Sequence, residues 1–291
     1  MFQGSICALI TPFRDGAVDE KRYEDFVEWQ IGQGTDGVVP CGTTGESPTL
    51  SHDEHRRVVE ICIGVAAGRV PVIAGTGSNS TAEAVELTRH AKEAGADAAL
   101  VVTPYYNKPT QEGLFRHFKE INDAVDLPVI IYNIPGRSVI DMTVETMVRL
   151  SKLPNIVGVK DATAQVARAT TQKLAIGADF CQLSGEDMTQ IGFLAQGGHG
   201  CISVTANVAP KEMAEMHAAW RAGDLGRAQG LNDRLMPLHI DLFCESSPGP
   251  VKYATSLIGK CGAETRLPLC EISDASKKKV EAAMRSAGLL N

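Results

Sequence analysis

Short apolar runs alternate with longer amphipathic segments along most of this chain, and this alternation constrains its fold more than any other feature. The runs predict eight buried β-strands, spaced about 25 to 30 residues apart and separated by segments with helical periodicity. The predicted strands are residues 5–10, 37–40, 71–74, 98–103, 128–132, 156–160, 180–184 and 200–204. Eight strand–helix units in succession predict an α/β fold of the parallel (β/α)8 barrel type, the TIM barrel.

Helix starts support this assignment. Asp19 and Ser51 are good N-cap residues, and each precedes a segment whose apolar residues recur at helical spacing. Further helices are predicted at residues 81–95, 114–125 and 164–175, with a short one from Thr143. A doubly wound sheet is the competing α/β fold, but it usually carries Gly-x-Gly-x-x-Gly after its first strand. Here the first strand is followed by Thr-Pro-Phe, and the Gly-Thr-Gly at 75–77 lacks the third glycine.

The rhythm changes after about residue 222. Residues 224–243, 250–257 and 273–287 all have a helical pattern, with no strand between them. We therefore expect a catalytic barrel over residues 1–222 and a C-terminal helical region over residues 223–291.

Composition excludes several classes of function. The net charge of −7 is spread along the chain, and the one basic run, at 277–279, is best interpreted as the solvated face of a helix, so no nucleic-acid partner is expected. No apolar stretch approaches the roughly 18 residues of a membrane span, and the N-terminus lacks the pattern of a signal peptide. The eight cysteines occur singly, without Cys-x-x-Cys or zinc spacing, which fits a reducing cytoplasm.

Active sites of such barrels form at the C-terminal ends of the strands, and this rule selects a short list of polar residues. The candidates are Thr11, the turn 42–46, the segment 103–107, the segment 132–137, Lys160 with Asp161, and Ser184 to Glu186. Hydroxyl groups dominate, together with one lysine and one arginine.

Lys160 ends the apolar run 156–159 and is the most reactive candidate. Burying a lysine ammonium is costly, and a lowered pKa that leaves the amine neutral avoids that cost. A neutral amine in a dry pocket attacks carbonyls to form a Schiff base. The alternative is a surface lysine just past the strand end, paired with Asp161.

The neighbouring candidates suit the same chemistry. Tyr132 is the last residue of the adjacent predicted strand. Its phenol and the threonine hydroxyls both donate and accept protons, so these groups can form a proton relay. Glycines around Thr43 and Thr44 let backbone N–H groups approach a carboxylate, and Arg137 offers a bidentate fork to a second one. The alternatives are a tyrosine packed in the core, an ordinary turn at 42–45, and an ion pair between Arg137 and Asp141.

Metal and cofactor chemistry is not expected. His52 and His55 are three residues apart, but they sit at the start of a helix among capping residues, with no third ligand cluster. His199 lies in a turn before the eighth strand, on the opposite end of the barrel, and receives no role.

Four motifs together resemble the dihydrodipicolinate synthase family, within the superfamily of pyruvate-dependent class I aldolases. They are GTTGES at 42–47, TPYYNKP at 103–109, YNIPGR at 132–137 and GVKDAT at 158–163. The resemblance extends over essentially the whole chain. It implies a lyase that condenses pyruvate with L-aspartate-4-semialdehyde to give 4-hydroxy-tetrahydrodipicolinate, the first committed step of diaminopimelate and lysine biosynthesis.

The resemblance also implies a role for each matched residue. Lys160 would form the Schiff base with pyruvate, beside Tyr132 as proton donor and acceptor. Thr43 and Tyr106 would continue the proton relay, with Tyr106 supplied by the neighbouring subunit. Thr44 and Ile202 would contact pyruvate, Gly185 would also belong to the substrate-binding residues, and Arg137 would receive the carboxylate of the semialdehyde.

Regulation and assembly follow from the same resemblance. It implies a homotetramer built from two dimers and feedback inhibition by L-lysine. The implied lysine site comprises Ser47, Pro48, His52, His55, Asn79, Glu83 and Tyr105. Pro48 departs from the family pattern, in which small residues such as alanine are frequent at this position.

Two other functions compete. One is another 2-keto-acid aldolase, such as a sialic-acid lyase; those enzymes resemble the chain around the lysine but lack an arginine at the place of Arg137. The other is a barrel that binds a small amino acid or keto acid without catalysis, which would have little reason to keep both Lys160 and Tyr132.

Overall fold

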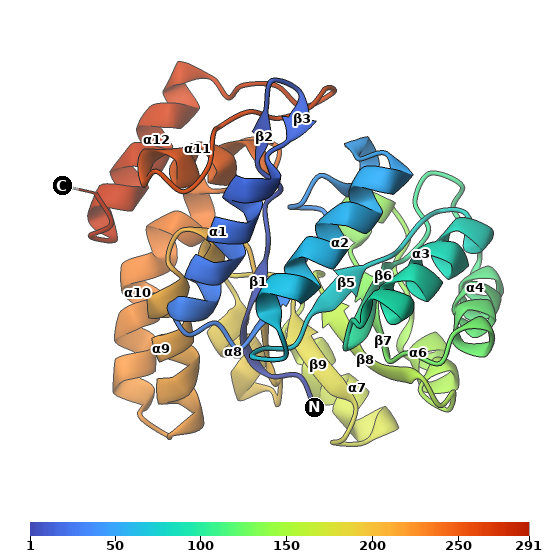
Figure 1. Cartoon of the computed structure of the whole chain (residues 1–291). Helices are drawn as coiled ribbons and strands as arrows, with labels where there is room; N and C mark the ends of the chain where they lie inside the picture. Colours follow the sequence, from blue (N-terminus) through green and yellow to red (C-terminus); the bar gives the residue numbers. More distant parts are fainter. Residues whose placement is uncertain (291) are drawn as a thin grey trace. The chain divides into compact units, whose positions relative to one another are not determined.

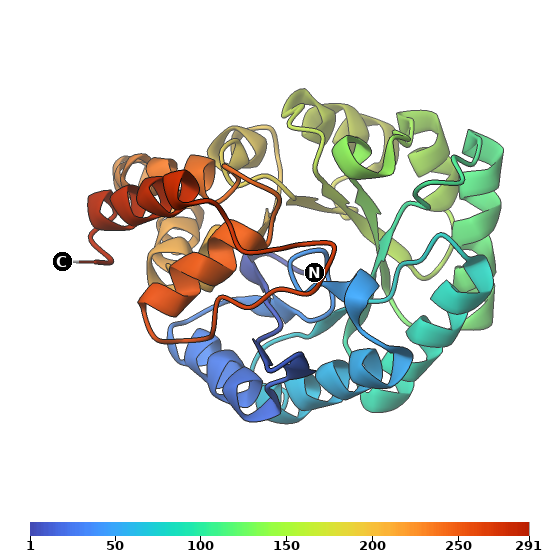
Figure 2. The ribbon, with the colours of Figure 1, turned by 90° about the horizontal axis from the view of Figure 1, so that it is seen from above.

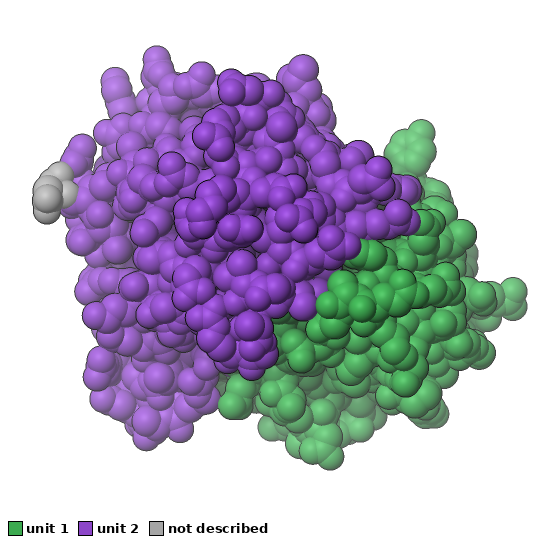
Figure 3. Space-filling model, viewed as in Figure 1, with its two compact units in different colours: residues 1–3, 71–202 green, residues 4–70, 203–291 purple. Residues whose placement is uncertain are grey.

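The computed structural model describes residues 1–290 (Figure 1). These residues form two compact units, coloured separately in Figure 3. Unit 1 comprises residues 1–3 and 71–202, and unit 2 comprises residues 4–70 and 203–290. The predicted division after residue 222 stays a prediction.

Unit 1 is built on parallel strands that are hydrogen-bonded in the order β10-β9-β8-β7-β6-β5. The strands are β5 (Ile73–Gly75), β6 (Ala98–Val102), β7 (Val129–Asn133), β8 (Ile156–Asp161), β9 (Cys181–Ser184) and β10 (Gly200–Ser203). The helices are α3 (Thr81–Ala94), α4 (Gln111–Ala124), α5 (Pro135–Ser138), α6 (Val144–Leu150), α7 (Ala167–Ile176) and α8 (Gln190–Ala195).

These strands are buried on both faces, which explains their continuous apolar runs. Val129, Ile130 and Ile131 of β7 are all fully buried. A parallel strand covered by helices on one face and by core on the other shows such a run instead of alternation. In Figure 2 the helices of unit 1, coloured teal to yellow-green, lie outside the strands that they follow.

Unit 2 contains the parallel pair β1 and β4, a short antiparallel hairpin, and helices from both ends of the chain. Its strands are β1 (Gly4–Ala8), β2 (Phe13–Arg14), β3 (Ala17–Val18) and β4 (Gly37–Val39). Its helices are α1 (Glu20–Gly32), η1 (Ser47–Thr49), α2 (His52–Ala66), η2 (Thr205–Asn207), α9 (Pro210–Arg221), α10 (Leu225–Asp241), α11 (Gly249–Leu257) and α12 (Asp274–Ser286).

The helix starts predicted at Asp19 and Ser51 are confirmed, and the caps show why, whereas the helices predicted from residues 114 and 164 begin at Gln111 and Ala167. The Asp19 side chain accepts a hydrogen bond from the backbone N–H of Arg22 at the start of α1. Ser51 and Glu54 form a reciprocal capping box at the start of α2. The three helical segments predicted after residue 222 correspond to α10, α11 and α12.

Several elements were not predicted, among them α8, α9 and two very short features. The β2–β3 hairpin has two residues in each strand, and α5 has four residues. Segments of this length carry no readable hydrophobic period, so pattern analysis assigns them to loops. Among residues 1–290, no helix is long and apolar enough to cross a membrane.

A buried ion pair joins α11 to the turn after β4. The Lys252 and Glu46 side chains are 0% and 1% exposed, with 2.7 Å between Nζ and Oε1. Nζ also donates to the Thr11 carbonyl at 2.9 Å, and the other Glu46 oxygen accepts from the backbone N–H of Arg266 at 3.0 Å. Burial lowers the pKa of Lys252, while the Glu46 carboxylate opposes that shift. Both charged groups therefore have hydrogen-bond partners, but removing either one would leave the other charge buried and uncompensated.

We expect Glu46→Gln to lower the free energy of unfolding by about 3–5 kcal/mol, because it leaves the Lys252 ammonium buried without its counter-charge. Denaturant titration measures the change. The control is Lys21→Met, which removes an ion pair with Asp25 whose side chains are 72% and 59% exposed. That control should lower the free energy of unfolding by about 1 kcal/mol or less. Equal losses of unfolding free energy for Glu46→Gln and Lys21→Met would contradict the conclusion that the buried Lys252–Glu46 pair depends on both of its members.

Candidate active site

Lys160 and Tyr132 face each other at the C-terminal ends of neighbouring strands. Lys160 on β8 and Tyr132 on β7 are direct register partners. Lys160 is 6% exposed and Tyr132 5% exposed. The Lys160 Nζ lies 4.1 Å from the centroid of the Tyr132 ring. The register between two parallel strands thus places a buried amine against a phenol.

The alternative of a surface lysine paired with Asp161 is wrong. Lys160 is buried, and successive side chains on a strand point to opposite faces. The Asp161 carboxylate instead accepts from Arg168 Nε at 3.0 Å and from the Thr163 hydroxyl at 2.6 Å. The charge of Asp161 is therefore balanced by an arginine.

Gly185 leaves the space that the Lys160 side chain occupies. A Cβ atom at residue 185 would lie 3.1 Å from Lys160 Cε and 2.8 Å from Ala162 Cβ. The Gly185 N–H donates to the Asp161 carbonyl at 2.7 Å, which fixes this close approach. A side chain at this position would push the lysine aside.

Two carboxylates follow Gly185 and shape the charge around the lysine. Burial raises the pKa of Glu186, the neighbouring Asp187 raises it further, and the positive charge of Lys160 opposes the shift. Asp187 is only 2% exposed, and the Cys201 Sγ lies 3.8 Å from its Oδ1. Sequence analysis missed Asp187. Its position directly after the 184–186 segment was the available signal.

Ile202 lies on β10 and is 1% exposed, and because its side chain is apolar, its backbone N–H and C=O are the only polar groups that it offers.

Arg137 lies on α5, directly after β7, and is exposed. The Asp141 carboxylate is hydrogen-bonded to Asn133 Nδ2 at 2.7 Å and forms an ion pair with Arg168 at 3.2 Å. Between Arg137 and Asp141 the backbone passes through Val139, whose φ is 69°. A β-branched residue rarely adopts this left-handed conformation, so the segment is strained.

Thr43 and Thr44 belong to unit 2, in the turn after β4. Thr44 is 4% exposed and Thr43 is half-buried. The turn is closed by a 3.1 Å hydrogen bond from the Gly45 N–H to the Gly42 carbonyl. The Thr11 hydroxyl also donates to the Gly45 carbonyl at 2.7 Å, which anchors the turn to the segment after β1.

Tyr106 stands out by its exposure. Its side chain is 90% exposed and its φ is 70°, a conformation that a large side chain rarely adopts.

The residues predicted to bind lysine fall into two groups. Asn79, Glu83 and Tyr105 are in unit 1, where the Ser78 hydroxyl donates to Glu83. Burial raises the pKa of the Tyr105 phenol, and the Glu83 carboxylate adds to that shift. The remaining members lie in unit 2, in or next to η1 and on the first turn of α2: Ser47, Pro48, His52 and His55.

Pro48 fits its place because a proline suits the first turn of a helix such as η1. His55 is buried, whereas His52 is exposed. Within residues 1–290, no group of three or more His, Cys, Asp or Glu side chains is arranged to hold a metal ion.

Comparisons with known proteins agree with one another over the full chain. A 4-hydroxy-tetrahydrodipicolinate synthase of Rhodospirillum centenum is 66% identical over 290 residues, covering 100% of both chains. The protein of the same name in Parvibaculum lavamentivorans is 64% identical, again over 100% of both chains.

Solved structures extend the agreement to the fold. The chloride-inhibited dihydrodipicolinate synthase of Acinetobacter baumannii, solved with pyruvate, has a TM-score of 0.97 at 49% identity and covers 100% of both chains. The enzyme of Cyanidioschyzon merolae, solved with lysine bound, has a TM-score of 0.96 at 38% identity over 99% of each chain. The predicted (β/α)8 barrel fold is confirmed.

The family described as the dihydrodipicolinate synthetase family matches residues 1–287. With relatives at this identity over the full length, the chain belongs to the dihydrodipicolinate synthetase family.

Proposed function

We propose that this chain is a lyase of the class I aldolase type that condenses pyruvate with L-aspartate-4-semialdehyde to give 4-hydroxy-tetrahydrodipicolinate. The names of its full-length relatives support this activity. The observation that carries the proposal is the buried amine of Lys160, 4.1 Å from the centre of the Tyr132 ring at the ends of β8 and β7. A buried lysine beside a proton-transfer group suits Schiff-base chemistry.

In the first step, the Lys160 nitrogen attacks the keto carbon of pyruvate. A C–N bond forms, and the keto oxygen leaves as water once it has been protonated. Tyr132 would supply and recover these protons, with Thr43 and the Tyr106 of a neighbouring subunit continuing the relay. The backbone at Thr44, Gly185 and Ile202 would hold the pyruvate carboxylate.

In the second step, the protonated imine draws electrons from the pyruvate methyl group. Loss of a methyl proton gives an enamine, whose terminal carbon attacks the aldehyde carbon of the semialdehyde. Arg137 would bind the carboxylate of this acceptor through its planar fork. The amine of the acceptor then attacks the imine carbon, which closes the ring and releases Lys160.

Arg137 also bears on the competing aldolase function. A sialic-acid lyase takes a neutral sugar as its acceptor and has no carboxylate to place there, so an arginine at this position favours the semialdehyde. Competition between the semialdehyde and N-acetylmannosamine as acceptor separates the two activities.

Regulation, assembly and location complete the proposal. L-Lysine would inhibit by binding beside Glu83, whose carboxylate suits the ammonium of the ligand. The exposed and strained Tyr106 suits a subunit interface, and we infer a homotetramer built from two dimers. The scattered free cysteines suit the reducing cytoplasm.

Borohydride reduction in the presence of pyruvate should attach the three-carbon unit to Lys160, because reduction fixes the imine as a stable amine. Mass spectrometry of digested protein locates the adduct. Lys160→Ala should abolish it, whereas Lys173→Ala, which removes an exposed lysine on α7, should not. An adduct on another lysine, or none in the unchanged protein, would remove the proposed mechanism.

Arg137→Gln should lower kcat/KM for the semialdehyde by about 10- to 100-fold, since a charge-assisted bidentate contact contributes about 1.5–3 kcal/mol. Pyruvate trapping at Lys160 should persist, because Arg137 acts on the second substrate. Steady-state kinetics with each substrate varied in turn gives the result. A comparable loss of pyruvate trapping would argue against this division of roles.

Glu83→Gln should raise the L-lysine concentration for half-inhibition by about tenfold or more, because the ligand ammonium loses its carboxylate partner. Inhibition curves at fixed substrate concentrations measure the shift. Glu86→Gln on the same helix is the matched control. Activity that stays flat across millimolar lysine in the unchanged protein would refute the regulatory part of the proposal.

A further inference from the structure

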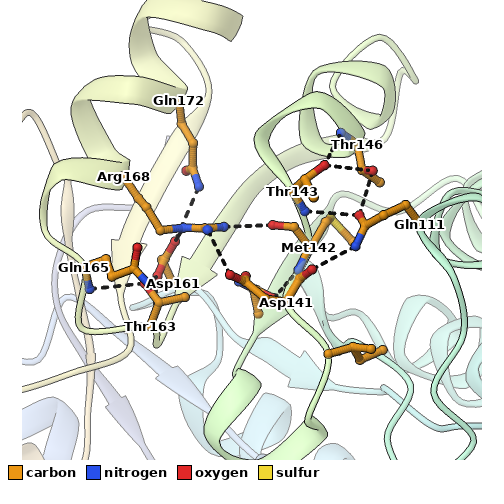
Figure 4. Close-up of polar contacts among 12 residues, drawn as sticks. Gln111, Asp141, Met142, Thr143, Thr146, Asp161, Thr163, Gln165, Arg168 and Gln172 are labelled. Carbon is orange, nitrogen blue, oxygen red and sulfur yellow. Dashed lines mark hydrogen bonds and ion pairs between the residues drawn. The ribbon is translucent and has the colours of Figure 1, made fainter.

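A polar cluster ties the ends of β7 and β8 to the segment that carries Arg137. We name it the Arg168 cluster; it comprises Asn133, Asp141, Met142, Asp161 and Arg168. Figure 4 shows Arg168 reaching from its helix between Asp161 on one side and Asp141 with Met142 on the other. None of these residues has a part in the chemical steps proposed above.

Arg168 bonds three partners at once through its guanidinium. Its Nε lies 3.0 Å from Asp161 Oδ2, its Nη1 lies 3.2 Å from Asp141 Oδ2, and its Nη2 donates to the Met142 carbonyl at 2.9 Å. The Arg168 side chain is 13% exposed and that of Asp161 is 3% exposed. The contact to Asp161 is thus largely shielded from solvent, where charge-assisted hydrogen bonds are strong.

Asn133 forms a second set of hydrogen bonds to residues 141–142. Its Nδ2 donates to Asp141 Oδ1 at 2.7 Å, and its Oδ1 accepts from the backbone N–H of Met142 at 3.0 Å. Asn133 follows Tyr132 in the sequence, just as Asp161 follows Lys160. The residue after each reactive group is therefore connected to the same short segment, 141–142: Asn133 directly, and Asp161 through Arg168.

Gln111 holds this segment from the other side. Its Nε2 donates to the Asp141 carbonyl at 2.8 Å, and its Oε1 accepts from the Thr143 N–H at 3.1 Å. Figure 4 shows these contacts beside those of Arg168. The backbone at 141–143 is consequently fixed by side chains from α4, β7 and α7.

The segment between β7 and residue 141 needs such support. It contains α5, which at four residues is too short to be stable alone, and Val139 at a φ of 69°. The Ser138 hydroxyl contacts the carbonyls of Ile134 and Ile140 at 2.9 and 3.0 Å. Strain of this kind persists only where neighbouring contacts over-determine the backbone.

We propose that Arg168 is a positioning residue that holds the Arg137 segment at a fixed place relative to the strand end of Lys160. It acts through Asp141 and Met142 on the segment and through Asp161 on β8. This inference rests on the proposed function, in which Arg137 binds the acceptor and Lys160 binds pyruvate. A shift of about 1 Å between two such groups can cost roughly 100-fold in rate.

Lysine cannot replace arginine in this cluster. Its ammonium is a single point charge on a flexible stem, whereas the guanidinium presents donors in a rigid plane. Arg168→Lys would keep a charge beside Asp161 and lose at least one of the two contacts to residues 141–142. The variant therefore tests the geometry while it limits the loss of charge balance.

We expect Arg168→Lys to lower kcat/KM for the semialdehyde by about 10- to 100-fold, mainly through KM. Pyruvate trapping at Lys160 should change by no more than about threefold. The control is Arg149→Lys on α6, an arginine paired with Glu112 at 2.8 Å, with both side chains nearly half exposed. Arg149→Lys should alter neither kcat/KM for the semialdehyde nor pyruvate trapping at Lys160. Thermal unfolding confirms that each variant is folded.

Asp141→Asn is the second variant, since Asp141 is 42% exposed and tolerates substitution better than buried Asp161. It removes the charge that Arg168 holds and should also raise KM for the semialdehyde. In an Arg137→Gln background this effect should vanish, because the cluster then has no acceptor contact left to position. A merely structural role would lower activity equally in both backgrounds.

Three results would overturn the inference. They are an unchanged KM for the semialdehyde in folded Arg168→Lys, an equal loss of pyruvate trapping and condensation, and full additivity of Asp141→Asn with Arg137→Gln. Should Arg168→Lys fail to fold, the additivity test decides alone. Absence of a pyruvate adduct in the unchanged protein would instead refute the proposed function.

Discussion

Withdrawal of one amine from water is the constraint on which the rest of this structure depends. Lys160 is buried because β8 carries it to the strand end, while register pairs it with Tyr132 and Gly185 leaves room for its methylene groups. Water would hydrate the amine and compete with the ring for it. Each neighbouring feature can be understood as keeping this amine dry, oriented or electrically balanced.

Charge balance around the lysine is divided between two faces of the sheet. Glu186 and Asp187 lie near the Lys160 amine; burial and the charge of Asp187 raise the pKa of Glu186, and the positive charge of Lys160 opposes that shift. Asp161, one residue beyond, points the other way and is balanced by Arg168. Because successive strand residues face opposite sides, adjacent residues can serve chemistry and architecture without interfering with each other.

The strands, the capped helices and the placement of Lys160 and Tyr132 at strand ends could be predicted from the sequence, because each depends on residues that are close together in the chain. The caps at Asp19 and Ser51 and the buried run before Lys160 are examples. The Arg168 cluster could not be predicted, since its members come from three elements and no spacing connects Asn133 to Arg168. The burial of Lys252 was equally hidden: its partner, Glu46, lies 206 residues away in the chain.

That long-range pair has a consequence for how the protein is made. The turn that carries Thr43 and Thr44 ends at Glu46, whose two carboxylate oxygens are satisfied by Lys252 and by the backbone of Arg266. Both partners lie more than 200 residues later in the chain. During translation the acidic side chain must stay hydrated, and the turn settles only after the C-terminal helices have emerged. The folding of the turn at residues 42–46 is thus coupled to residues that are synthesised more than 200 positions later.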